Sequence, residues 1–326
     1  MNERKQDNSG KVESNQYAIP IIEREGRKFV VTVLTDLDGT VNDESVREDQ
    51  RMTTIGPAKD AIAEFESRNI PVGIITARSF EEAVEYQTAL CATGIIICED
   101  GAVIGLPLHA MNTQFEEELA KQYKLEVHKD RKILRLGSIT TQHIKELLED
   151  VQIKSGENQK IISSCTSNPD QLAVAAHHSM AREAKLSQGR LASAYAVGLS
   201  PVQLKLVEEL APQRNIRTFT SSVDKTTLFF GADTNKGHAV DVLRANPYIF
   251  YPQSVKADGI FMIAIGNHNN DAPLLSKADM AVVVAKPDGS YAISTEHIPS
   301  DALVMKQPFG HGIKEAVPQI LNTLQL

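Results

Sequence analysis

A nearly continuous run of apolar and β-branched residues, Phe29–Thr35, leads directly into the polar segment Asp-Leu-Asp-Gly-Thr at 36–40. A run of this kind is typical of a strand that is buried on both faces of a parallel sheet. In open α/β sheets, ligands and catalytic groups collect at the carboxyl ends of the strands. This junction therefore predicts an α/β fold with chemistry at the end of its first buried strand.

The rest of the chain repeats the alternation of strand and helix. Apolar strands alternating with helices of this length indicate βαβ units and a parallel sheet. In the first part we expect a helix with Pro57 in its first turn, a strand at 72–76, a helix near 80–90 and a strand at 95–98. After residue 226 we expect a helix at 236–244, a strand at 259–265, a helix at 272–278, a strand at 280–285 and a closing helix from residue 313.

The alternation loosens in the middle of the chain. That stretch contains a strand candidate at 131–136, a helix that starts after the N-cap candidate Ser138, and helix starts at 168–170 and 200–201. We predict one α/β core built from both ends of the chain, with the middle of the chain inserted as a second domain. The predicted domains are a polar, disordered tail at 1–16, a core formed by 17–107 and 225–326, and an inserted domain at 108–224.

Composition excludes several classes of function. The 326 residues carry a formal net charge of −8, which argues against a protein that wraps duplex nucleic acid. No apolar run approaches the roughly 20 residues that a membrane span needs, and the first 28 residues lack a signal-peptide core. The three cysteines form no CxxC pair and resemble small buried hydrophobes of a reducing compartment. We therefore expect a cytoplasmic protein that binds neither nucleic acid nor membrane.

Four polar motifs follow predicted strands or open predicted helices. They are Asp-Leu-Asp-Gly-Thr at 36–40, Thr-Ala-Arg at 76–78, Thr-Asn-Lys-Gly at 234–237 and Gly-Asn-His-Asn-Asn-Asp at 266–271. Two carboxylates two residues apart, followed by a glycine that permits a sharp turn, can hold a divalent cation and still present an oxygen to a substrate. Alone, the first motif would be read as an acidic turn without chemistry, but the order of all four is far more specific.

In the order of these motifs the chain resembles the haloacid dehalogenase-like phosphohydrolases. Within that superfamily it is most similar to the mannosyl-3-phosphoglycerate phosphatase and Cof-type group. The similar segments are Thr-Asp-Leu-Asp-Gly-Thr at 35–40, Cys-Glu-Asp-Gly-Ala at 98–102, Lys-Gly at 236–237 and Asn-Asp-Ala-Pro-Leu-Leu at 270–275.

The resemblance implies a role for each motif residue. Asp36 would be the nucleophile that accepts the phosphoryl group, and Asp38 would protonate the leaving oxygen and then activate water. Thr76 and Lys236 would bind the transferring phosphoryl oxygens. The remaining candidates around the substrate are Gly39, Thr40, Ala77, Arg78 and Asn270.

The implied cofactor is Mg²⁺, held by Asp36, the backbone carbonyl of Asp38 and the fourth motif. That motif departs from the pattern that the resemblance implies, because Asn267 stands where the first acidic residue is usual. An amide oxygen can ligate Mg²⁺ but brings no charge, so we expect weaker metal binding, with Asp271 as the remaining acidic ligand. His268 is interpreted as a loop residue beside the metal.

The resemblance also implies that the core is Rossmann-like and that the inserted domain is an α/β cap of the C2 type. In this predicted cap, Arg182 and Glu183 resemble an Arg-Glu segment that related phosphatases place over the substrate. The segment that follows does not continue the pattern, and an exposed helix pair is an equally good interpretation.

The sequence thus predicts a Mg²⁺-dependent phosphatase that hydrolyses a small phosphorylated sugar or sugar-acid through an aspartyl phosphate. Two alternatives stay open: a phosphosugar mutase of the same superfamily, and a catalytically weak phosphosugar-binding or regulatory protein. Its partner would be a small phosphorylated metabolite, and the chain would be a monomer or a homodimer.

Overall fold

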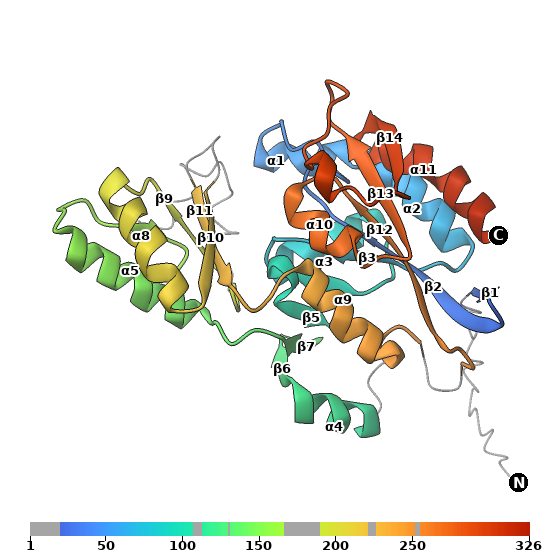
Figure 1. Ribbon diagram of the computed structural model, residues 1–326, viewed down its shortest axis with the longest axis horizontal. Coiled ribbons are helices and arrows are strands. Elements are labelled where there is room, and N and C mark those ends of the chain that lie inside the picture. The colour runs from blue at the N-terminus through green and yellow to red at the C-terminus, as the bar shows by residue number, and fades with distance from the viewer. Residues whose placement is uncertain (1–19, 107–112, 130, 166–189, 221–225, 252–254) are drawn as a thin grey trace, which may run out of the picture.

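The computed structural model describes residues 20–106, 113–129, 131–165, 190–220, 226–251 and 255–326. Two lobes are evident in Figure 1. The larger lobe contains both the first strands and the closing helix, and the smaller lobe contains the middle of the chain. The predicted disordered tail at 1–16 and the predicted helix start at 168–170 lie outside the described residues.

The larger lobe is built on one ten-stranded sheet. Its strands run in the order β14-β13-β12-β2-β3-β4-β5-β7-β6, and β1 pairs with β2. Neighbours from β14 to β4 are parallel, so their carboxyl ends share one edge of the sheet. The bounds are β1 Ile21–Arg24, β2 Arg27–Thr35, β3 Val72–Ile75, β4 Ile96–Cys98, β5 Val103–Gly105, β6 Lys124–His128, β7 Arg131–Arg135, β12 Gly259–Gly266, β13 Met280–Ala285 and β14 Leu303–Pro308.

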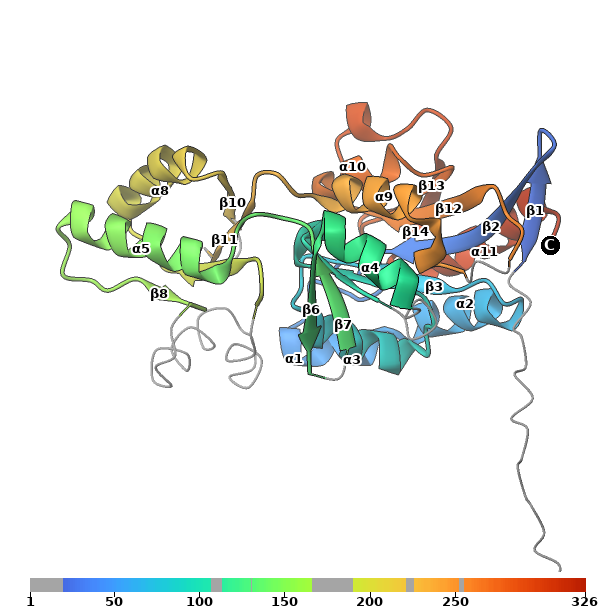
Figure 2. The same cartoon turned by 90° about the horizontal axis from the view of Figure 1, so that it is seen from below.

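Helices cover both faces of the large sheet, as the apolar first strand predicts. In β2, Val31 and Val33 pack into one core with α2, α3 and α11, whereas Val30 and Leu34 pack into a second core with α4, α9 and α10. Figure 2 shows α9 and α2 on opposite sides of the sheet. The helices are α1 Glu48–Arg51, α2 Gly56–Ser67, α3 Phe80–Leu90, α4 Thr113–Gln122, α9 Lys236–Ala245, α10 Ala272–Leu275 and α11 Phe309–Leu324.

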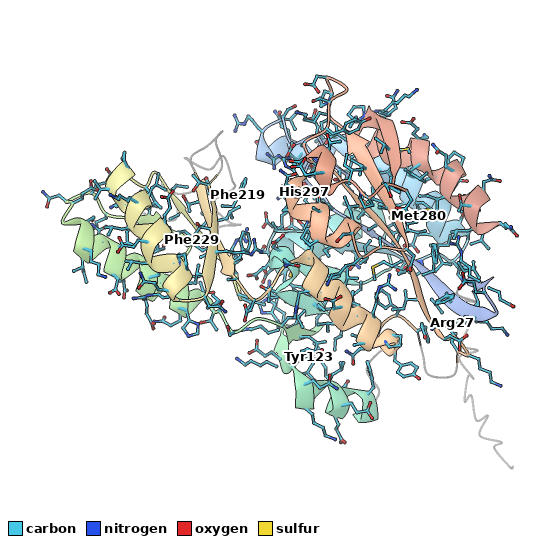
Figure 3. All side chains as sticks on the ribbon, viewed as in Figure 1. Arg27, Tyr123, Phe219, Phe229, Met280 and His297 are labelled. Atoms are coloured by element: carbon cyan, nitrogen blue, oxygen red, sulfur yellow. The ribbon has the colours of Figure 1, made fainter. Side chains whose placement is uncertain are left out.

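The smaller lobe is a separate four-stranded antiparallel sheet in the order β10-β11-β9-β8, with two helices on one face. Phe229 of β11 packs between this sheet and the helices, and Figure 3 shows it on the helical side of the lobe. The bounds are α5 Thr141–Ser155, β8 Ile162–Ser163, β9 Ala194–Val197, α8 Pro201–Gln213, β10 Ile216–Thr220 and β11 Thr226–Gly231. The α/β fold with an inserted cap is therefore confirmed.

The start of the inserted unit differs from the predicted boundary at residue 108. Strands β6 and β7 extend the large sheet through antiparallel pairing with β5, and α4 packs into the second core of the same lobe. The alternation of Ile133 and Leu134, which contact opposite cores, shows that β7 is buried on both faces. The sheet of the smaller lobe continues through β11 to Gly231, so the inserted unit ends later than the predicted end at 224.

Helix ends follow local capping chemistry. Ser200 caps α8 as predicted, with its side chain accepting a hydrogen bond from the Gln203 N–H. The prediction of Ser138 as a cap is wrong: Thr140 caps α5, and the Ser138 hydroxyl donates to Asp233 instead. The closing helix starts at Phe309, four residues earlier than expected, and α10 is shorter than expected. Within the described part of the chain, no helix is long and apolar enough to cross a membrane.

The loop before β4 touches the neighbouring strand so closely that it requires glycine. A Cβ on Gly94 would lie 2.4 Å from the Gly73 nitrogen and 2.5 Å from the Val72 carbonyl carbon, both in the backbone of the sheet. We expect Gly94→Ala to lower the free energy of unfolding by about 1–3 kcal/mol, because backbone atoms cannot move aside as a side chain can. Gly56→Ala is the control, since no atom lies within 4 Å of the added methyl there. Urea unfolding followed by circular dichroism measures both, and equal stability of the two variants would contradict this close approach.

Candidate active site

The candidate site begins where the central strands β2 and β12 end. The Asp36 N–H donates to the Ile265 carbonyl at 2.9 Å, which fixes the first residue after β2 against the neighbouring strand. The Asp36 side chain is buried, with 8% of its surface exposed. The two strands run side by side because apolar residues fill both of their faces, so their polar extensions come together at one edge of the sheet.

A buried lysine joins two carboxylates at this edge. Lys236 is the first residue of α9, and its Nζ atom donates to Asp36 Oδ1 and to Asp271 Oδ1, each at 2.6 Å. Burial lowers the pKa of Lys236, but Asp271 and Asp36 outweigh burial and hold that pKa above its usual range. Burial, and repulsion from Asp271 and Asp38, raise the pKa of Asp36 to about 7 in the metal-free protein, against the opposing attraction of Lys236.

Asp271 also organises the fourth motif. Its Oδ2 atom accepts hydrogen bonds from the Asn267 and His268 N–H groups, both at 2.9 Å. The Asn267 Oδ1 atom accepts the Thr40 hydroxyl at 3.0 Å, and both of these side chains are buried. Thr40, predicted to bind substrate, is thus placed beneath the site, where it orients Asn267.

Asp38 lies in a cationic setting. Two guanidinium nitrogens of Arg78 bind its two oxygens at 2.7 and 2.6 Å, Arg51 binds Oδ1 at 3.0 Å, and the Asn42 amide donates to the same oxygen at 3.2 Å. Burial raises the pKa of Asp38, but Arg78 and Arg51 more than offset burial and hold that pKa below its usual range. Asp38 is therefore ionised in this arrangement, and its carboxylate is held in one orientation.

Arg78 differs from its prediction as a substrate-binding residue. Its guanidinium contacts Asp38 on one side and Glu82 at 3.0 Å on the other, and the side chain is only 8% exposed. Glu82 belongs to α3, where it also forms a capping box with Ser79. The fork–fork pairing with Asp38 makes Arg78 a residue that positions Asp38.

The other predicted residues occupy varied positions. Thr76 is buried directly after β3, next to β2, and its hydroxyl accepts the Arg78 N–H at 3.2 Å. Gly39 has a φ of +75°, in the region that favours glycine. Asn270 is exposed, and the Ala77 carbonyl accepts a hydrogen bond from Arg190 of the smaller lobe at 3.0 Å. Arg182 and Glu183 lie outside the described residues.

Contacts with the smaller lobe centre on the segment after β4. The buried Glu99 carboxylate accepts the Leu191 and Ala192 N–H groups at 2.7 and 2.8 Å and the Ser193 hydroxyl at 2.8 Å. Next to it, Asp100 pairs with Arg217 of β10. Glu99 and Asp100 both have positive φ values, 51° and 57°, so the turn aims adjacent carboxylates at the other lobe. These contacts join the small lobe to the edge of the large sheet that carries Asp36.

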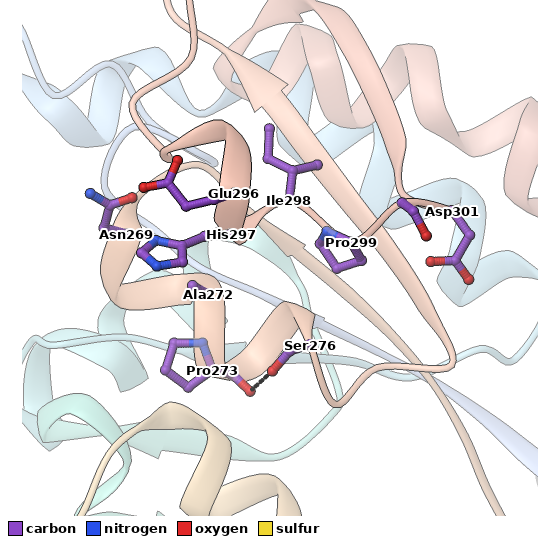
Figure 4. Close-up of a pocket in the computed structure, with 10 residues that line it drawn as sticks. Asn269, Ala272, Pro273, Ser276, Glu296, His297, Ile298, Pro299 and Asp301 are labelled. Atoms are coloured by element: carbon purple, nitrogen blue, oxygen red, sulfur yellow. Dashed lines mark hydrogen bonds between the residues drawn. The ribbon is translucent and has the colours of Figure 1, made fainter.

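A hollow of about 620 Å³ lies behind the fourth motif, as Figure 4 shows, and is separate from this cluster. Asn269, Glu296 and His297 are among the residues that line it, and none of the predicted site residues does so.

Comparison with known families decides the class of the protein. The family model described as haloacid dehalogenase-like hydrolase matches residues 33–293, which include all four motifs. The chain belongs to the haloacid dehalogenase-like hydrolases. A search of curated protein sequences finds no match. The predicted superfamily and the prediction that the chain is an enzyme are confirmed.

Solved structures share the fold of this hydrolase at low sequence identity. Thermoplasma acidophilum 0175 is 14% identical, with a TM-score of 0.57 over 91% of this chain and 99% of that chain. A haloacid dehalogenase-like hydrolase from Bacteroides thetaiotaomicron gives 14% and 0.57 over 89% and 98%. BT1666 from Bacteroides thetaiotaomicron, described among the phosphatases of the superfamily, gives 15% and 0.54 over 97% and 99%.

The oxygen groups at the sheet edge fit a hard divalent cation in kind. They are the Asp36 carboxylate, the Asp38 carbonyl and the Asn267 amide oxygen, and Mg²⁺ prefers such ligands. Because Gly39 lacks a Cβ, which would lie 2.2 Å from Asn267 Nδ2, the amide can reach the loop that follows β2. Charge is sparse, since Lys236 occupies one oxygen of each buried carboxylate. In the described ranges no group of three or more His, Cys, Asp or Glu residues is arranged to hold a metal.

Several residues of the site carry no signal in the sequence. Arg51 and Asn42 hold Asp38 from the segment after Thr40, and Glu99 holds the small lobe. The spacing of Arg78 and Glu82, four residues apart across a helix start, could have indicated their ion pair. No local pattern marks Arg51, because its contact with Asp38 depends on how the intervening loop folds.

The raised pKa of Asp36 predicts a pH-dependent stability for the metal-free hydrolase. An acid whose folded pKa, about 7, exceeds its unfolded value of 3.8 binds a proton on folding, so its contribution to stability falls as pH rises between these values. Asp36→Asn removes this titration. We expect the variant to gain stability over the wild type as pH increases from 4 to 8 in the presence of EDTA. Thermal unfolding across that range measures the difference, and a difference that is constant with pH would contradict the prediction.

Proposed function

We propose that the chain is a Mg²⁺-dependent phosphatase that hydrolyses a small phosphorylated sugar or sugar-acid. The observation that carries the proposal is the buried Asp36–Lys236–Asp271 cluster at the carboxyl end of the central strands. A carboxylate held beside a permanent cation can approach a phosphate dianion that would otherwise repel it.

In the proposed reaction, Asp36 attacks phosphorus and the bond to the leaving oxygen breaks. Asp38 gives that oxygen a proton, and afterwards takes a proton from the water that hydrolyses the aspartyl phosphate. Lys236 and Thr76 stabilise the charge on the transferred oxygens. Mg²⁺, held by the oxygens of Asp36, Asp38, Asn267 and Asp271, would supply further charge compensation.

The Arg78 fork sets a condition on the first step. It stabilises the carboxylate form of Asp38, which is the form of a base, so donation of a proton requires the Asp38 side chain to rotate away from Arg78. The loop that carries Asp38 has the exposure for this movement, since the Asp38 side chain is 30% exposed while Arg78 is 8% exposed. Arg78 would then hold Asp38 as the base for the second step.

The small lobe is proposed as a cap that selects the substrate, with Arg182 and Glu183 as candidate contacts. Among the structural neighbours, BT4131 is described as a subclass IIB sugar phosphatase, with a TM-score of 0.53 and 12% identity over 89% of this chain and 98% of that chain. That description, with the resemblance to the mannosyl-3-phosphoglycerate phosphatase and Cof-type group, favours a phosphorylated sugar or sugar-acid.

Phosphate release from a panel of phosphosugars, with and without Mg²⁺, tests the function. We expect release that depends on Mg²⁺ in the wild type and a loss of more than a thousandfold in Asp36→Asn, because the amide is a poor nucleophile of similar shape. Isomerisation without release would favour a mutase, and ligand binding without turnover would favour a regulatory protein. Turnover of Asp36→Asn within about tenfold of the wild type would contradict the covalent mechanism.

The Glu99 contacts predict a variant that affects binding more than chemistry. In Glu99→Gln, an amide NH₂ replaces an oxygen that accepts donors from the small lobe, so one buried contact becomes donor against donor. We expect KM to rise about tenfold while kcat changes by less than threefold, because the reacting groups are untouched. Steady-state kinetics on the best substrate measures both, with Glu64→Gln on the exposed face of α2 as the control. A tenfold fall in kcat with no change in KM would show that the Glu99 contacts do not control the position of the cap.

A further inference from the structure

The candidate metal site holds little negative charge for a divalent cation. When both are ionised, the buried Asp36 and Asp271 at the edge of the sheet carry one negative charge each, and Lys236 neutralises one of the two charges. Asn267, which is 1% exposed and donates its N–H to Asp271, adds an oxygen without charge. Affinity for hard cations depends on the charge and number of their oxygen ligands, so a further carboxylate nearby would matter.

Glu44 places a carboxylate beside Asn267. A Cβ atom added to Gly39 would lie 2.2 Å from Asn267 Nδ2 and 2.8 Å from Glu44 Oε1. Because both atoms are so near the same point, the distance between Asn267 Nδ2 and Glu44 Oε1 is at most 5.0 Å. The Asn267 amide nitrogen and the Glu44 carboxylate therefore lie close together beside Gly39, in the loop that carries Asp36 and Asp38.

Contacts from two directions hold Glu44 in this position. Arg51 donates to the Glu44 backbone carbonyl at 2.9 Å and binds Asp38 with its other nitrogen, which ties the segment to the site. The His268 ring lies 3.3 Å from Glu44 Oε1, so the residue next to Asn267 also orients the carboxylate. Glu44 remains 34% exposed, which leaves room for water around its second oxygen.

We propose that Glu44 supplies the negative charge that Asn267 lacks and is an outer anionic group of the metal site. Mg²⁺ keeps several water molecules in most protein sites, and a carboxylate about one water away stabilises such a hydrated ion. This inference rests on the proposed metal dependence. It assigns Glu44 to cation binding, whereas the reacting groups remain Asp36 and Asp38.

Titration calorimetry with Mg²⁺ alone, in the absence of any substrate, measures the effect directly. Glu44→Gln keeps the shape of the side chain and an acceptor oxygen for His268, and we expect it to raise the Kd for Mg²⁺ roughly three- to tenfold. Glu64→Gln, which removes an equal charge from the exposed surface of α2, is the matched control and should leave Kd within about twofold. Far-UV circular dichroism verifies that both variants are folded.

A second substitution, Asn267→Asp, tests whether the effect of Glu44 depends on the charge at position 267. Asn267→Asp places a carboxylate at 267, and we expect it to lower the Kd for Mg²⁺ roughly tenfold. In that background Glu44→Gln should raise the Kd by a smaller factor than in the wild type, because repulsion from the new carboxylate at 267 turns the partly exposed Glu44 carboxylate away from the site. The effect of Glu44 would then depend on the charge at 267.

The outcomes separate this inference from the proposed function. If Glu44→Gln leaves Kd equal to that of the control, or weakens binding by the same factor in both backgrounds, the role assigned to Glu44 is wrong while the metal dependence stands. If the wild type shows no Mg²⁺ binding and no Mg²⁺-dependent phosphate release, the proposed function itself fails. Weakening by Glu44→Gln that is larger in the wild type than in the Asn267→Asp background supports the inference.

Discussion

The contact of Lys236 with Asp36 and Asp271 is the interaction on which the site depends. Three charged groups are buried there, and ions removed from water are tolerated only when they are paired and hydrogen-bonded. One lysine between two carboxylates leaves the cluster with a single net negative charge, and Asp271 relieves part of its own charge through two backbone N–H groups. The arrangement joins the ends of β2 and β12 to the start of α9, so segments about 200 residues apart in the chain are fixed at one point.

A second electrostatic centre forms around Asp38, and its contrast with the first gives the two carboxylates different properties. Asp36 shares one cation with another acid, and burial raises its pKa. Asp38, two residues later, is bound by both Arg78 and Arg51, and its pKa is lowered despite burial. Neighbouring carboxyl groups can be assigned different roles when their surroundings separate their pKa values. Here one aspartate is enclosed beneath the sheet edge, and its partner is held in a guanidinium fork near the surface.

The sequence predicts the large features of this structure because they depend on local pattern. The β-branched run before Asp36 becomes β2, Pro57 opens the first turn of α2, and Ser200 caps α8. The order of four motifs identifies the superfamily and brings Asp36, Lys236 and Asp271 into one site. Prediction fails where the partner is distant: β7 reads as part of the insertion but pairs with β5, and Ser138 bonds to Asp233 across 95 residues. Likewise, no local pattern indicates that Arg78 pairs with Asp38, which follows a different strand.

The absence of a side chain at Gly39 allows negative charge to be placed differently within this site. The left-handed turn at Gly39 leaves no side chain between the loop after β2 and the fourth motif. In that space Asn267 and Glu44 come together, one neutral and buried, the other charged and partly exposed. A carboxylate at the buried position would need compensation within the low-dielectric interior, whereas a carboxylate at the exposed position keeps contact with water. Placing the charge on Glu44 therefore spares the buried cluster a third acid and still leaves a negative group within reach of a hydrated cation.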